Sequence, residues 1–263
     1  MARQTAIKTF HYLEGPDAAP VLMFSNSLGT NYRMWDPQVP VLSGRYRVLR
    51  YDTRGHGASE VAPGPYDIAL LSRDVLALLD QLGLARVTFC GLSIGGMIGT
   101  WLGAHAPERV ERLVLCNTSA LMGGSDAWNT RIDTVRRDGM GAIADTVIER
   151  WFTPRFRAAD PGAVERIRQM LLATPASGYV ACCAAVRDMD HRTLLSRITT
   201  PTLVIAGTHD PATPVSHARV LAERIAGARL VELDAAHLSN IEATTTFNAA
   251  VLDFLADGRI GSG

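Results

Sequence analysis

Short apolar runs recur along the chain, and most of them are separated by stretches with helical spacing. The runs are rich in Val, Leu, Ile and Phe, and several show no alternation with polar residues; they cover residues 20–25, 47–52, 87–91, 112–117, 201–207 and 229–234. Runs without alternation are typical of strands that are covered on both faces. We therefore predict that these segments form one sheet.

The clearest helix between two of these runs spans residues 67–83. Asp67 can cap its start, and Gly83 can end it. Its apolar residues recur at spacings of three and four, at Leu71, Val75, Leu78, Leu79 and Leu82. Strands that alternate with such helices indicate an α/β fold, with a mostly parallel sheet flanked by helices. Ligands gather at the carboxyl ends of the strands in these sheets, so we expect the site in the loops that follow strands.

One long segment breaks the alternation. Between residues 121 and 195 we find no convincing strand, and four helical stretches are bounded by Gly, Pro, Ser or Asp, at residues 125–139, 140–152, 161–174 and 177–190. We predict a helical cap at residues 121–195, inserted into an α/β core that consists of residues 1–120 and 196–263. A chain of 263 residues is long enough for one such domain.

The charge balance narrows the class of partner. Lys and Arg together number 26, as do Asp and Glu, and there is no basic run or stripe. The chain therefore lacks the positive electrostatic field that attracts nucleic acid or an anionic membrane surface, and a small-molecule partner is favoured. The first ten residues carry no apolar leader run, and no stretch is long enough to span a bilayer, so we expect a cytoplasmic protein. The oligomeric state stays open.

Cysteine and histidine usage gives no sign of a metal. Cys90, Cys116, Cys182 and Cys183 form neither a spaced disulfide framework nor a CxxC metal motif, and we expect reduced thiols in the core. The histidines show no spacing typical of metal ligands. We predict neither a metal site nor a cofactor.

Ser93 is the central residue of the pattern G-x-S-x-G, in the stretch "GLSIG" at residues 91–95. The pattern follows an apolar strand directly and precedes a helix. A sharp turn between strand and helix exposes the central side chain, and it requires small residues on either side. Such short strings also arise by chance in glycine-rich chains, but the strand-then-helix context favours a nucleophile.

A serine nucleophile requires a base and an acid that orients the base. Asp210 and His237 follow Ser93 in the chain order serine, acid, histidine, and each comes shortly after a later strand. Taken singly, Asp210 could cap the next helix, and His237 could be an ordinary loop histidine. Three such residues in this order at three strand ends favour a triad, with Ser93 as nucleophile, His237 as base and Asp210 as acid.

Acyl transfer also requires N–H donors for the developing oxyanion. Ile94 follows the nucleophile and supplies one backbone N–H; the loop after the first parallel strand supplies the other, for which we choose Ser27. Ser27 could equally be a simple turn former. The stretch at residues 51–59 looks structural, with Asp52 and Arg54 able to pair, and we assign it no chemistry.

Several motifs together resemble the α/β-hydrolase superfamily along nearly the whole chain: "SNSLGT", "YDTRGHGAS", "GLSIGG", "GTHD" and "DAAHLSNIE". "SNSLGT" replaces the usual His-Gly oxyanion loop, and with "ERWFTP" and "LCNTSA" it resembles the 3-oxoadipate enol-lactonases of the β-ketoadipate pathway for aromatic breakdown. The resemblance implies that 3-oxoadipate enol-lactone is hydrolysed by the triad and the two oxyanion donors named above. The chain departs from the family at its start, since only residues 5–12 are strand-like before Gly15; one edge strand is expected to be absent or short.

The implied lactone carries a free carboxylate, so the cap should present a cation or several N–H donors to it. The candidates for this role are Arg131, Arg155 and Arg187, and Trp128 and Trp151 are candidates for the pocket walls. Solvated arginines and core tryptophans are the alternative interpretations.

Other activities would keep the same triad. A carbon-carbon bond hydrolase or a carboxylesterase on this fold would differ mainly in the cap, and a non-catalytic ligand receptor would have no use for the triad. Both an acyl-enzyme on Ser93 and a direct attack by water that His237 activates fit these residues.

Overall fold

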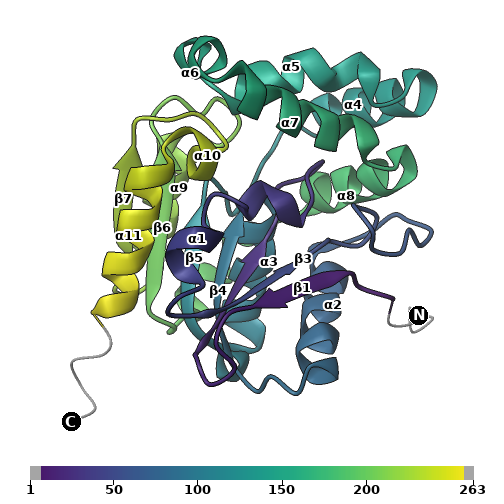
Figure 1. Cartoon of the computed structure of the whole chain (residues 1–263). Helices are drawn as coiled ribbons and strands as arrows, with labels where there is room; N and C mark the ends of the chain where they lie inside the picture. The colour runs from purple at the N-terminus through teal and green to yellow at the C-terminus, as the bar shows by residue number, and fades with distance from the viewer. Residues whose placement is uncertain (1–6, 258–263) are drawn as a thin grey trace.

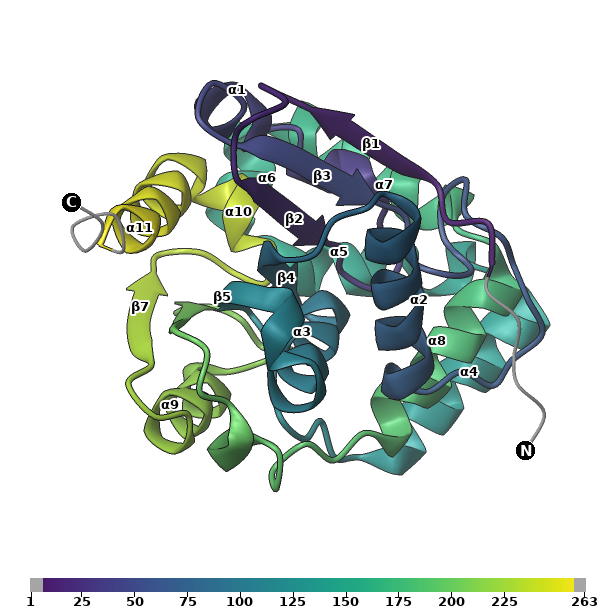
Figure 2. The same ribbon diagram turned by 90° about the horizontal axis from the view of Figure 1, so that it is seen from below.

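The computed structural model describes residues 7–257, and within them the chain forms one sheet of seven strands in the order β1-β3-β2-β4-β5-β6-β7 (Figures 1 and 2). The strands are β1 (His11–Glu14), β2 (Val21–Ser25), β3 (Arg47–Tyr51), β4 (Val87–Leu92), β5 (Val110–Cys116), β6 (Thr202–Gly207) and β7 (Arg229–Leu233). All neighbours pair in parallel except β1, which lies antiparallel to β3 at the edge. The predicted mostly parallel sheet is confirmed.

The short edge strand β1 falls where the sequence indicated a short or absent strand. It has four residues and begins near the end of the predicted stretch 5–12, whose first two residues lie outside the described residues. The expectation that the N-terminus carries no leader run also rests partly on residues 1–6, which are not described.

Helices cover both faces of the sheet, as Figure 2 shows: α1 and α11 lie on one face, and α2, α3 and α9 lie on the other. Their bounds are α1 (Val39–Leu42), α2 (Ile68–Gln81), α3 (Ile94–His105), α9 (Val215–Arg224) and α11 (Thr244–Ala256), with the short α10 (Ser239–Glu242) before α11. Asp67 caps α2 as expected, since its side chain accepts a hydrogen bond of 2.6 Å from the Leu70 N–H.

Five further helices follow one another between β5 and β6: α4 (Ser125–Asp138), α5 (Gly141–Trp151), α6 (Pro154–Ala159), α7 (Pro161–Ala173) and α8 (Ala176–Asp188). Figure 1 shows them together over one end of the sheet. The extra helix relative to the sequence prediction is α6, whose first N–H groups are capped by the Thr153 side chain. We refer to residues 121–195 as the proposed cap.

The proposed cap packs directly on the loop after β3. A Cβ atom at Gly55, where φ is +77°, would lie 2.7 Å from the Cα atom of Gly178 in α8. Close by, the Tyr66 N–H donates to the Ala181 carbonyl at 3.2 Å. This backbone-to-backbone contact requires glycine on both sides and fixes α8 against the sheet.

The four cysteines are buried and free, as expected. Among residues 7–257 no single helix is long and apolar enough to cross a membrane, whereas α7 and α8 pass that test by length and composition only as a pair bent by 95°.

Candidate active site

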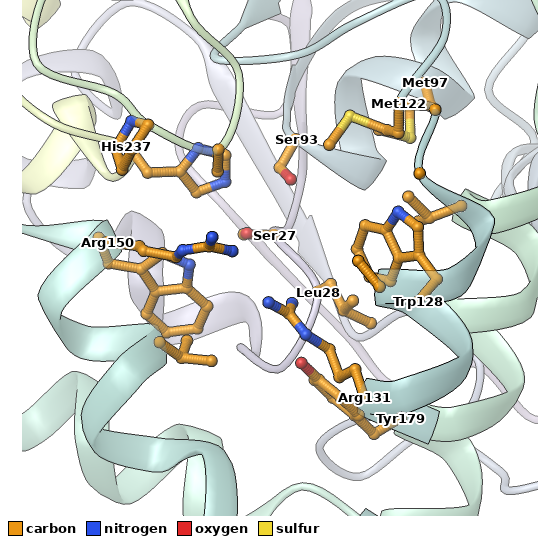
Figure 3. A pocket seen from close by; sticks show the side chains of 18 residues that line it. Ser27, Leu28, Ser93, Met97, Met122, Trp128, Arg131, Arg150, Tyr179 and His237 are labelled. Atoms are coloured by element: carbon orange, nitrogen blue, oxygen red, sulfur yellow. The ribbon is translucent and has the colours of Figure 1, made fainter. Parts of the chain in front are cut away.

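Ser93 occupies a strained turn between β4 and α3. Its φ of 58° and ψ of −117° lie outside the usual regions for a residue with a side chain, a conformation that costs on the order of 1–3 kcal/mol. The Ser93 N–H donates to the carbonyl of Cys116 at 2.9 Å, which ties the turn to the end of β5. The side chain consequently faces a cavity instead of the core (Figure 3).

The glycines around this serine are required by close backbone contacts. A Cβ atom at Gly91 would collide with the Gly95 carbonyl, and one at Gly95 would collide with the Ser25 carbonyl. A Cβ atom at Gly96 would lie 2.6 Å from the Cβ atom of Thr118. The turn therefore tolerates no larger residue at these positions without a shift of the backbone.

His237 lies in the loop after β7 and is buried, with 3% of its side chain exposed. Its Nδ1–H donates to Asp210 Oδ2 at 2.7 Å. This bond leaves Nε2 as the acceptor nitrogen. Both Ser93 and His237 line the same cavity (Figure 3), although no hydrogen bond joins them within residues 7–257; such bonds often form only in the substrate complex.

Asp210 is held as a carboxylate by several donors. Besides His237, the Thr213 hydroxyl donates to Oδ2 at 2.6 Å and Asn117 Nδ2 donates to it at 3.0 Å, while Oδ1 accepts from the N–H groups of Ala212 and Thr213. Burial acts to raise the pKa of Asp210, but the charge of His237 and the hydrogen bonds from His237, Thr213 and Asn117 lower it to about 2. The carboxylate therefore stays charged at neutral pH.

Asn117 is a residue that the sequence prediction missed. It follows β5 in the left-handed region, with φ at 43°, which asparagine tolerates better than most residues. Its Nδ2 also donates to the Ala236 carbonyl at 3.2 Å, and its Oδ1 accepts from the Ser239 hydroxyl at 2.6 Å. Asn117 thus joins the acid to the loop that carries His237. The available signal was its position in "LCNTSA", directly after a strand.

The backbone N–H groups of the two predicted oxyanion donors, Ile94 and Ser27, differ in their hydrogen bonding. Ile94 opens α3, so its N–H has no acceptor within the helix. The Ser27 N–H donates to Met34 Sδ at 3.2 Å. The loop that contains Ser27 is fixed to α3, because the Asn26 carbonyl accepts from the Gly95 N–H at 3.2 Å. Thioether sulfur is a weak acceptor, so a substrate oxyanion would displace the Met34 sulfur from the Ser27 N–H.

His56 holds the same loop from the side of the sheet. Its Nε2 accepts from the Gly29 N–H at 2.9 Å, and its Nδ1 lies 3.3 Å from the Arg54 carbonyl. Burial lowers the pKa of His56 to about 4, against a smaller opposing effect of the bond to Arg54. The predicted pairing of Asp52 with Arg54 is wrong: Arg54 forms a two-point bond with Asp74 at 2.6 and 2.7 Å, and Asp52 accepts only backbone N–H groups.

The cavity in front of Ser93 has a volume of about 250 Å³ and is lined by 18 residues (Figure 3). This is below the roughly 300–1,000 Å³ of pockets for drug-sized ligands, which favours a small substrate. The cavity brings together most of the predicted site residues, namely Ser27, Ser93, Trp128, Arg131, Trp151 and His237. Leu28 and Met97 extend its apolar wall.

Arg155 and Arg187 do not line this cavity. Arg155 is 69% exposed and donates to Asp234 at 2.8 Å. Arg187 pairs with Asp188 at 2.7 Å and also donates to Asn129 at 2.8 Å. Both guanidinium groups are therefore engaged outside the cavity, that of Arg155 with the loop after β7 and that of Arg187 within the proposed cap.

Arg150 and Tyr179 line the cavity and were not predicted. Figure 3 shows the guanidinium groups of Arg150 and Arg131 pointing into it from two different helices, α5 and α4. Arg131 stacks over the Trp128 ring, 5.0 Å from its centroid, and its charge acts to lower the pKa of the neighbouring Tyr179. No aspartate or glutamate is among the lining residues, so the cavity is positively charged.

A metal has no evident place in the part of the chain that the structure describes. No three His, Cys, Asp or Glu side chains in residues 7–257 are grouped closely enough to hold an ion. The polar groups that line the cavity include the side chains of Ser93, His237, Arg131 and Arg150.

Known proteins share this architecture. A family model described as alpha/beta hydrolase fold matches residues 20–244. The chain is 47% identical to 3-oxoadipate enol-lactonase 2 of Acinetobacter baylyi over 232 residues, an alignment that covers 88% of this chain and 87% of that protein. It is 38% identical to 3-oxoadipate enol-lactonase 1 of the same organism over 235 residues, which cover 89% of this chain and 88% of that protein. The crystal structure of the enol-lactonase from Burkholderia xenovorans superposes with a TM-score of 0.94 at 46% identity, covering 96% of this chain and 99% of that chain. The chain belongs to the alpha/beta hydrolase fold family and is a hydrolase, as its motifs predicted.

Proposed function

We propose that this hydrolase opens 3-oxoadipate enol-lactone to 3-oxoadipate, a step in aromatic breakdown by the β-ketoadipate pathway. The observation that carries the proposal is the cavity that joins Ser93 and His237 to the guanidinium groups of Arg131 and Arg150; among the described residues, neither arginine has an ion-pair partner and no carboxylate lines the cavity. A small ester that bears a carboxylate suits such a cavity. The similarity to enol-lactonases at 47% and 38% identity supports the same substrate.

In the first half of the reaction, His237 Nε2 takes the proton of Ser93 as Oγ attacks the lactone carbonyl. The N–H groups of Ile94 and Ser27 hold the oxyanion of the tetrahedral intermediate, and the Ser27 N–H exchanges the Met34 sulfur for this oxygen. The ring C–O bond then breaks, and the enol oxygen receives the proton from His237. The enol tautomerises to a ketone, so it departs more easily than an ordinary alkoxide.

In the second half, water replaces the enol. His237 removes a proton from the water as it attacks the acyl carbon, and Ser93 leaves with that proton. Asp210 keeps His237 in the tautomer with Nδ1 protonated and stabilises the imidazolium in both halves. Trapping of a covalent adduct on Ser93 would separate this sequence from a direct attack by water activated by His237.

The proposed cap supplies substrate recognition. Arg131 is the predicted arginine that lines the cavity, where it stacks over the Trp128 ring. We assign it to the carboxylate of the lactone. Trp128 and Trp151 both line the cavity, and Figure 3 shows Trp128 in its wall.

A comparison of three substrates tests the proposal. We expect the wild-type protein to give its highest kcat/KM with the enol-lactone, a lower value with p-nitrophenyl acetate, and no turnover of a meta-cleavage dienoate. Preference for the neutral ester would favour a carboxylesterase, and turnover of the dienoate would favour a carbon-carbon bond hydrolase. Ligand binding without hydrolysis of any of the three would favour a receptor.

A further inference from the structure

We propose that Arg131 and Arg150 form a two-cation site that binds both ends of a short-chain dicarboxylate, with Arg150 as the residue that distinguishes two carboxylates from one. The inference rests on the proposed function for its choice of ligand length. It adds a specificity residue and a ligand class to the cavity in front of Ser93.

The first observation is that neither guanidinium group is neutralised by the protein. Within residues 7–257, neither Arg131 nor Arg150 has a carboxylate within ion-pair distance. Most other arginines of the proposed cap do have one: Arg136, Arg137, Arg155, Arg157, Arg168, Arg187 and Arg192. An arginine that points into a cavity without an acidic partner is free to bind an anion there.

The second observation concerns Tyr179, which lines the cavity beside Arg131 (Figure 3). Burial raises the pKa of Tyr179, with a further increase from Cys183, and Arg131 opposes this only in part. The phenol therefore stays neutral and leaves the charge of Arg131 uncompensated. The Trp128 ring, over which Arg131 stacks, orients the guanidinium without cancelling its charge.

The third observation places Arg150 relative to the reacting groups. Its neighbour Trp151 accepts a hydrogen bond of 3.1 Å on its carbonyl from the N–H of Leu238, the residue after His237. The end of α5 is thereby tied to the loop that carries the histidine. Arg150 and Arg131 approach the cavity from different helices (Figure 3), an arrangement that suits two separated carboxylates better than one.

The reaction itself supplies the second charge. The lactone carries one carboxylate, and hydrolysis converts its ester carbonyl into another, releasing one proton. Two cations therefore match the two negative charges of the product, whereas the single carboxylate of the substrate is matched by one cation. A charge-assisted hydrogen bond corresponds to about ten- to a hundred-fold in affinity, so a dicarboxylate should bind more tightly than a monocarboxylate of the same length by that factor.

Calorimetry with adipate and hexanoate tests this inference, since neither compound is hydrolysed. We expect the wild-type protein at neutral pH to bind adipate at least ten-fold more tightly than hexanoate. Arg150→Met should remove most of that difference and leave hexanoate binding nearly unchanged. Arg150→Lys, which keeps the charge, should retain part of the preference, and it replaces the Met variant if that variant does not fold.

Arg166→Met is the matched control. Arg166 is an exposed arginine of the proposed cap that has no carboxylate within ion-pair distance among the described residues and does not line the cavity. Equal losses of adipate affinity in Arg150→Met and Arg166→Met would show a general effect of net charge and overturn the inference, as would equal affinities of the wild type for adipate and hexanoate. Turnover of the enol-lactone, measured on the same preparations, reports on the proposed function separately.

Discussion

Nδ1 of His237 lies 2.7 Å from Oδ2 of Asp210, and both side chains are buried beneath the cavity. The carboxylate is already fixed by Asn117 and Thr213, so the histidine ring meets a partner that cannot rotate away. This relationship determines which nitrogen of His237 faces the substrate. The first prediction follows from it.

Asp210→Asn should preserve the fold but lower kcat by roughly ten-thousand-fold, because an amide no longer selects the protonated Nδ1 tautomer or stabilises the imidazolium. Steady-state kinetics and circular dichroism on the same sample measure the two effects. A higher pH should not restore the rate. Loss of thermal stability with an unchanged rate would instead make Asp210 a structural cap.

Ser93→Ala should leave the protein folded and reduce kcat on the order of a million-fold, since a triad acts as a unit. The geometry of the turn between β4 and α3 depends on the glycines around Ser93 rather than on its hydroxyl, so a crystal structure of the variant should show the same turn. Lactonase activity near the wild-type level in a folded Ser93→Ala protein would end the assignment of Ser93 as nucleophile.

Arg131→Met should lower kcat/KM for the enol-lactone by about ten- to a hundred-fold, the value of one charge-assisted hydrogen bond. Hydrolysis of p-nitrophenyl acetate should stay nearly unchanged, because that ester carries no charge. Arg155→Met and Arg187→Met are the controls, since both arginines are paired outside the cavity. If these variants discriminate between the two substrates as strongly as Arg131→Met, recognition by Arg131 is wrong.

Acid should destabilise the protein through His56. In the unfolded chain a histidine binds a proton below a pH of about 6.5, whereas the pKa of His56 in the folded protein is about 4. Between these values the unfolded state binds more protons. The stabilisation is therefore complete above pH 6.5 and is lost as the pH falls to about 4, by an amount on the order of 3 kcal/mol.

Urea unfolding at several pH values between 4 and 7 measures this loss. His56→Gln is a suitable reference, because a glutamine carbonyl can accept from the Gly29 N–H but does not titrate. The buried His191 contributes in the same direction in both proteins, since its pKa is also lowered to about 4 by burial. Identical pH slopes for the wild type and His56→Gln would contradict the role of His56.

The sheet and the turn that carries Ser93 could be predicted because each depends on a short stretch of sequence. Apolar runs marked the strands, and the stretch "GLSIG" placed Ser93 between a strand and a helix. Asp210 and His237 could be proposed because both follow strands, and parallel strands bring their carboxyl ends to one edge. The order of residues in the chain was sufficient for these choices.

The arginines of the proposed cap could not be assigned in this way. Arg150 and Arg155 are five positions apart, yet one lines the cavity and the other pairs with Asp234. The difference arises because α5 ends at Trp151 and a new helix, α6, begins after its cap Thr153, so that Arg150 and Arg155 lie on different helices. The engagement of the Ser27 N–H by Met34 likewise depends on tertiary packing, and no sequence pattern marks it.

The direct pairing of β5 with β6 has a consequence for how this enzyme can diversify. Val114 lies opposite Leu203 in the parallel register although the whole helical segment intervenes along the chain. The pairing of these two strands therefore sets no particular length for that segment, provided that its two ends return to neighbouring strands. We therefore expect that natural selection or protein engineering can vary the proposed cap while Ser93, Asp210 and His237, which lie outside it, keep their places in the sequence.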